Sequence, residues 1–134
     1  MRRRDEDGAA AVEFAIVLIP LMLILFGIIS YAYMFSVRQA LTQAAAEGAR
    51  AAAVAPPGDS QARGTAAVEK ALGGYGDLDC GGAVACTVSS PAPCGSAQCV
   101  TVTVKLDYES YDPFNLPLVP MPKTLQFTSS AEVN

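Results

Sequence analysis

The hydrophobic and polar positions divide the chain into a long apolar stretch and a later region of mixed pattern. Residues 14–37 form a run without a single charged side chain. A helix of this length, about 24 residues, spans roughly 36 Å, enough to cross a hydrocarbon core of about 30 Å. Apolar side chains lie on every face, whereas a core helix of a soluble domain carries one stripe. The pattern therefore predicts a retained transmembrane helix over 14–37; the alternative is a cleaved secretory signal that begins with Arg2–Arg4.

An alanine-rich segment continues the helical pattern beyond the span. Residues 38–55 read RQALTQAAAEGARAAAVA, and Pro56-Pro57 ends the run. Because alanine is the strongest helix former, one helix is expected from about Ala9 to about Val54. Pro20 inside the span removes a backbone hydrogen bond, so we expect a kink or a short melted stretch there.

Small side chains recur along this segment in two neighbouring rows. They are Ala40, Ala44, Gly48 and Ala52 in the first row, and Ala45, Ala49 and Ala53 in the second. Small residues at a spacing of four allow another backbone to approach closely. The alternative is that the rows reflect alanine richness alone.

The region after Pro56 begins with a second, shorter helix. A cap at Asp59 or Ser60 starts it and Gly73-Gly74 ends it, while Gly64 weakens its first turn. Its apolar face is expected to hold Ala62, Ala66, Val68 and Leu72.

Strand patterns follow. Residues 99–106 alternate with period two, which places Val100, Val102, Val104 and Leu106 on one face. Residues 83–89 are the expected hairpin partner, 111–123 hold four prolines and read as an irregular loop, and 124–133 read as a final strand. The expected fold class is α+β: a long N-terminal helix over 9–55 and a small head over 56–134 with three or four antiparallel strands packed on that helix.

Charge and cysteine content narrow the function. The net charge is −4 and histidine is absent, so a nucleic-acid partner is not expected and the commonest general base and metal ligand are missing. No G-x-S-x-G motif is present. We therefore expect no enzyme activity, no cofactor and no metal site.

Four cysteines lie beyond the span, at Cys80, Cys86, Cys94 and Cys99. Their spacing contains no C-x2-C pair, so disulfides are favoured over zinc, and three pairings are open. Disulfides indicate an oxidising outer compartment. Arg2, Arg3 and Arg4 precede the span, which predicts a cytoplasmic N-terminus.

The junction at Gly8 is a candidate processing site. A charged leader, residues 1–8, ends in Gly8 just before the apolar helix. A cut there makes Ala9 the first residue, with a charged amine, and Glu13 the fifth. An ammonium group among apolar helices is costly unless it is paired, and Glu13 of a neighbouring subunit or of the same chain can pair with it. The alternative is that Glu13 is a solvated acid favoured by the helix dipole.

These features resemble a known family. The junction is similar to the prepilin-peptidase site of type IV pilins. The chain resembles the TadE-like family of pilin-like proteins of the tight adherence (Tad, or Flp) pilus system through GAAAVEFAIVLIPLMLILFGII, the VTVTV strand, YDPFNLPLVPMP and TLQFTSSAEV. Only Gly8, Ala9 and Glu13 carry over residue by residue, and Phe14 departs from the Tyr common in major Flp pilins.

The resemblance implies a minor pilin or pseudopilin. A prepilin peptidase would remove residues 1–8, and the helix would then pack with other pilin-like subunits through the membrane assembly platform and its secretion ATPase. We expect a single-pass protein of the cell membrane, in contact with lipid, with an extracytoplasmic head that reaches the pilus or cell surface after assembly. The alternative is an unprocessed, membrane-anchored adhesin or binding module that does not depend on Glu13.

Overall fold

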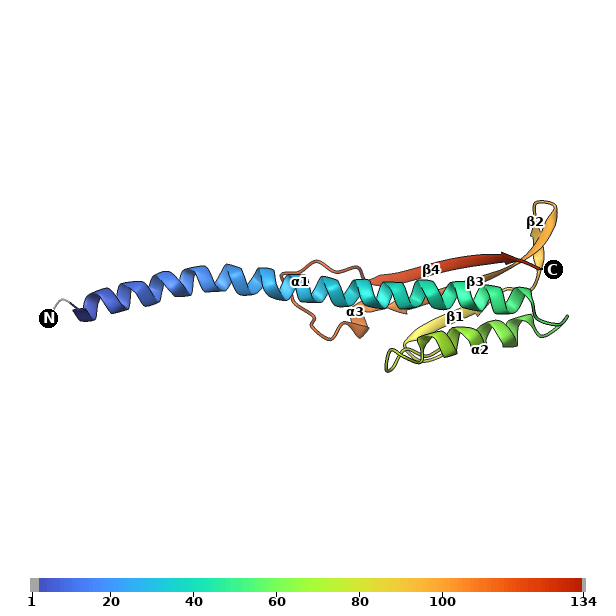
Figure 1. Cartoon of the computed structure of the whole chain (residues 1–134), viewed down its shortest axis with the longest axis horizontal. Coiled ribbons are helices and arrows are strands. Elements are labelled where there is room, and N and C mark those ends of the chain that lie inside the picture. Colours follow the sequence, from blue (N-terminus) through green and yellow to red (C-terminus); the bar gives the residue numbers. More distant parts are fainter. Residues whose placement is uncertain (1–2, 134) are drawn as a thin grey trace. The chain divides into compact units, whose positions relative to one another are not determined.

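A computed structural model describes the backbone of residues 3–133 and the side chains from Gly8 onward. The chain forms two compact units that divide between Tyr33 and Met34. Helix α1 (Arg3–Ala53) provides all of the described structure of the first unit and continues into the second (Figure 1). Arg2 and the side chains of Arg3 and Arg4, on which the predicted orientation depends, lie outside the described part.

In the first unit, α1 begins earlier than the sequence suggested. The helix starts at Arg3 instead of about Ala9, and it continues through Gly8. Arginine and glutamate are good helix formers, and a single glycine costs only about 1 kcal/mol, so the charged leader extends the helix. The helix also continues through Pro20, so the short melted stretch is not found there, while a kink at Pro20 stays a prediction.

The second unit is an α+β head, as the pattern predicted. Helix α2 (Ser60–Leu72) is followed by strands β1 (Val84–Val88), β2 (Ala92–Cys94), β3 (Ala97–Asp107) and β4 (Thr124–Glu132), with the short helix α3 (Tyr108–Tyr111) between the last two strands. All pairings are antiparallel and all involve β3. The register runs from Cys99 opposite Glu132 to Asp107 opposite Thr124 along one edge of β3. Strands β1 and β2 share the other edge.

The core lies between α1 and one face of this sheet. The predicted alternation of β3 is confirmed, because Val100, Val102, Val104 and Leu106 are fully buried. Both small-residue rows of α1 are buried as well: Ala40, Ala44, Gly48 and Ala52, and Ala45, Ala49 and Ala53. The two small-residue rows of α1 therefore pack against the head of the same chain.

Two glycines set how closely α1 and α2 approach. A Cβ on Gly48 would stand 2.5 Å from Cγ2 of Val68 and 3.2 Å from the carbonyl oxygen of Gly64. A Cβ on Gly64 would meet the Cβ of Ala52 at 3.1 Å and Val88 at 3.0 Å. The sequence suggested that Gly64 only weakens α2, whereas the structure places it at the crossing of the two helices.

This crossing also corrects the predicted face of α2. Ala62 and Ala66 are exposed, and the buried face is Ser60, Gly64, Val68 and Leu72. An exact four-residue spacing joins these positions, so one edge of the helix turns inward. The sequence pattern counted glycine and serine as non-core types and therefore chose a neighbouring face.

Each disulfide joins two cysteines that are close in the sequence. Cys80 pairs with Cys86, and Cys94 pairs with Cys99. The second bridge closes a tight hairpin that the sequence pattern had treated as a loop: β2 pairs with the start of β3, and Gly95 turns with a φ of +73°. Such a φ favours glycine at the first position of a two-residue turn. The proline-rich loop, defined here as residues 112–123, connects α3 to β4 without regular strand or helix.

Candidate functional site

The predicted processing residues lie near the N-terminal end of α1, where the described side chains begin. Gly8, Ala9 and Glu13 are all exposed on α1. Ala9 and Glu13 are one helical turn apart, so they share a face with a rise of about 6 Å between them. A Cβ on Gly8 would meet nothing within 4 Å, so packing inside this chain does not require a glycine at that position.

The position of Glu13 bears on its role. Because α1 begins at Arg3, Glu13 lies in the third turn of the helix. The helix dipole acts mainly on charges in the first turn, so it gives Glu13 little stabilisation in the uncut chain. Glu13 also makes no ion pair with any residue whose side chain the structure describes. A cut after Gly8 would move Glu13 to the start of the helix.

An apolar surface surrounds α1 after Glu13. Its large side chains are exposed on all sides; they include Phe14, Ile16, Val17, Ile19, Leu21, Leu23, Ile24, Leu25, Phe26, Ile28 and Ile29. The helix is long and apolar enough to cross a membrane over Gly8–Ala53, and none of its most apolar window is buried. Exposure of this many large side chains indicates an apolar environment such as lipid or other helices.

The other predicted chemistry gives no second site. All four cysteines form disulfides within the head. Among the described residues, no three His, Cys, Asp or Glu side chains gather where a metal ion could bind.

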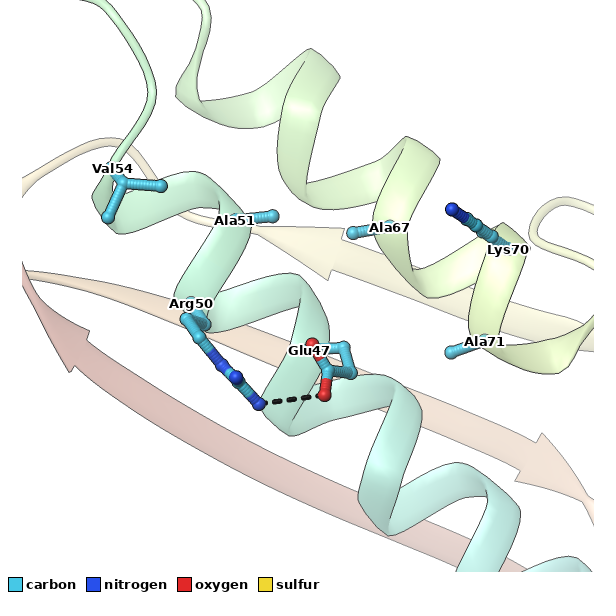
Figure 2. Close-up of a pocket in the computed structure, with 7 residues that line it drawn as sticks. All are labelled: Glu47, Arg50, Ala51, Val54, Ala67, Lys70 and Ala71. Atoms are coloured by element: carbon cyan, nitrogen blue, oxygen red, sulfur yellow. Dashed lines mark hydrogen bonds and ion pairs between the residues drawn. The ribbon is translucent and has the colours of Figure 1, made fainter.

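The sequence pattern missed one surface feature of the head. A groove of about 510 Å³, called here the alanine groove, lies between the end of α1 and the end of α2. Ala51 and Ala67 face one another across it (Figure 2). Its edges carry Arg50 from α1 and Lys70 from α2. Only the pairing of two helices creates this feature, so no run of residues in the sequence signals it.

Comparisons with known proteins agree with the resemblance seen in the sequence. The family model described as "TadE-like protein" matches residues 8–50. No curated protein and no solved structure matches the chain. The matched segment starts at Gly8 and contains Ala9, Glu13, the apolar surface and most of the buried alanine rows. Residues 8–50 are thus similar to the TadE-like family.

Proposed function

We propose that this protein is a minor pilin or pseudopilin of a Tad (Flp) type IV pilus, processed after Gly8 and assembled through its N-terminal helix. The observation that carries the proposal is the coincidence of two boundaries. The TadE-like match begins at Gly8, and the exposed apolar surface of α1 begins a few residues later. A segment with this surface is suited to lipid before assembly and to neighbouring helices afterwards.

Processing would change the electrostatics of the helix end. Removal of residues 1–8 leaves a charged amine on Ala9 beside an apolar surface. Glu13 provides the opposite charge on the same face, either in the same chain or in a neighbouring subunit. Pairing with a neighbour fixes the vertical offset between two helices, because an unpaired charge in an apolar bundle is strongly unfavourable.

Gly8 supports the same proposal. Glycine is the easiest ordinary residue to unwind in a helix, at about 1 kcal/mol relative to alanine. A peptidase needs an extended backbone at the bond it cuts, and a Cβ on Gly8 would meet nothing within 4 Å among the described residues. The proposed partners are a prepilin peptidase, other pilin-like subunits, the membrane assembly platform and lipid. The protein would have a cytoplasmic N-terminus, an extracytoplasmic head and no catalytic role.

The N-terminus of the mature chain tests this function. In cells with the complete pilus system, mass spectrometry is expected to find Ala9 as the first residue of the membrane and pilus forms. Gly8→Val is expected to retain Met1, because a branched side chain obstructs the cut. Gly27→Val is the matched control, since a Cβ at Gly27 also meets nothing within 4 Å. Retention of Met1 in the wild-type protein would favour the unprocessed adhesin instead.

A further inference from the structure

The alanine groove has a floor of small side chains and cationic edges. Ala51 from α1, Val54 just after α1, and Ala67 and Ala71 from α2 give it apolar walls. Short alanine side chains leave the space between the helices unfilled, so a larger apolar side chain can enter. Arg50 forms an ion pair with Glu47 at 2.7 Å, whereas Lys70 makes no ion pair with the described residues. The edge therefore keeps a net positive charge.

The proline-rich loop has the opposite character. Leu118 is 75% exposed at its centre, which is the highest exposure among the large apolar side chains described. Asp112 and Lys123 stand at the two ends of the loop, and Asp107 and Glu109 precede it in the sequence; Lys123 lies 3.7 Å from Glu109. Residues 107–123 thus carry three acids and one base, a net charge of −2. A segment with an exposed apolar side chain and a net negative charge matches an apolar groove with cations at its edge.

The two features lie at different ends of the head. The loop ends where Thr124 pairs with Asp107, at one end of the sheet. The groove lies beside the last turns of α1, toward the other end of the sheet (Figure 1). A contact between unlike patches on two copies is head-to-tail, and it repeats along a filament when its rotation does not close into a ring.

We propose that the proline-rich loop of one copy docks, through Leu118, into the alanine groove of a second copy. This inference rests on the proposed function for bringing copies side by side, and it adds the contact between their heads. An anionic lipid surface is a poorer partner for the loop, because the net negative charge of residues 107–123 is repelled there. The cationic edge of the groove attracts the same acids.

Photo-cross-linking of the full-length chain tests the contact. The probe is p-benzoylphenylalanine in place of Leu118, in cells that express isotopically light and heavy copies together. The expected result is a light–heavy adduct in the pilus fraction that maps to the α2 peptide containing Ala67 and Lys70. Ala67→Trp fills the groove and is expected to lower the adduct roughly tenfold, as overfilling of a packed contact does. Ala62→Trp, on the exposed side of the same helix, is the control and should leave the yield unchanged.

A second pair of variants tests the contact by charge alone, without filling the groove, so that a lower yield cannot come from misfolding of an overfilled helix pair. Lys70→Glu changes only an exposed side chain, and it is expected to lower the adduct about threefold to tenfold by placing like charges together. Lys105→Glu, exposed on β3, makes the same change in net charge and should have no effect. Absence of the adduct, an adduct with lipid or another protein, or a yield that neither Ala67→Trp nor Lys70→Glu alters would overturn the proposal. Leader removal is measured in the same samples, so a cleaved chain without the adduct refutes the head contact alone, and an adduct between uncleaved chains refutes the processing alone.

Discussion

Leu25 and Leu41 stand on the same helix, yet Leu25 is 44% exposed and Leu41 is fully buried. Around Leu25, the large side chains of α1 face outward on every side. Around Leu41, the helix has a buried face of small residues that the head of the same chain covers. The two stretches of one helix therefore have different partners. The partners of residues 34–53 are encoded in this chain, whereas the partners of the apolar surface after Glu13 are not.

Truncation of each leucine to alanine should give the largest difference between the two stretches. Leu41→Ala leaves a cavity in the core, and we expect it to lower the free energy of unfolding of the head by about 2–5 kcal/mol. Leu25→Ala has no packed surroundings in this chain and should change that free energy by less than about 0.5 kcal/mol. Thermal unfolding of the full chain in detergent micelles, followed by circular dichroism of the sheet, measures both. Equal losses for the two variants would contradict the assignment of separate partners.

Removal of the disulfides is the next largest effect. Replacement of Cys80 and Cys86 by alanine, or of Cys94 and Cys99, is expected to cost about 2 kcal/mol per bridge, because each bridge closes a loop of only a few residues. The loss should appear in the unfolding of the sheet and leave the helical signal of the apolar stretch unchanged. A reducing agent added to the wild-type protein provides the control. Loss of both signals together would show that the two stretches unfold as one unit.

Two glycines on α1 sharpen the comparison further. A Cβ at Gly48 would stand 2.5 Å from Val68, so Gly48→Ala is expected to destabilise the head by about 1–3 kcal/mol. A Cβ at Gly27 meets nothing within 4 Å, and Gly27→Ala should give a gain of about 0.5–1 kcal/mol in helix stability. Unfolding of each variant in micelles gives the sign of the change. A neutral Gly48→Ala would mean that α1 and α2 do not cross as described.

The ion pair at the groove has the smallest expected effect. Arg50 and Glu47 are 71% and 52% exposed at their side chains, so solvent screens their attraction. Arg50→Ala is expected to cost less than about 0.5 kcal/mol in unfolding experiments. Glu47→Ala serves as the reciprocal control. A loss of several kcal/mol would place this pair in the core of the head and not at the edge of a docking surface.

The sequence predicted those parts of the fold that depend on local pattern. The alternation of residues 99–106 gave the buried face of β3 correctly, and the uncharged run gave the apolar stretch of α1. The predicted face of α2 was correct for Val68 and Leu72 and wrong for Ala62 and Ala66. Gly64 is buried for its lack of a side chain, a reason that hydrophobicity does not encode. The pairing of the cysteines depends on β2, whose three residues are too short to signal a strand.

The sequence also predicted only part of the candidate site. Gly8, Ala9 and Glu13 were proposed from their order along the chain; the TadE-like match covers them, and their roles stay predictions. The start of α1 at Arg3 was missed, since the helix was expected to begin at about Ala9, after the charged leader. The alanine groove was missed because it joins residues from two helices that no sequence motif connects.

Incorporation of two glutamate variants into pili tests the central claim most directly. Glu13→Gln and Glu69→Gln remove the same charge, one in the stretch without partners in this chain and one on the exposed side of α2, outside the alanine groove. Each variant is co-expressed with an unaltered copy, and quantitative mass spectrometry gives the ratio of the two in sheared pili and in membranes. The account predicts that Glu13→Gln stays in the membrane and is depleted from pili, whereas Glu69→Gln enters pili at the wild-type ratio. Equal incorporation of Glu13→Gln would contradict it.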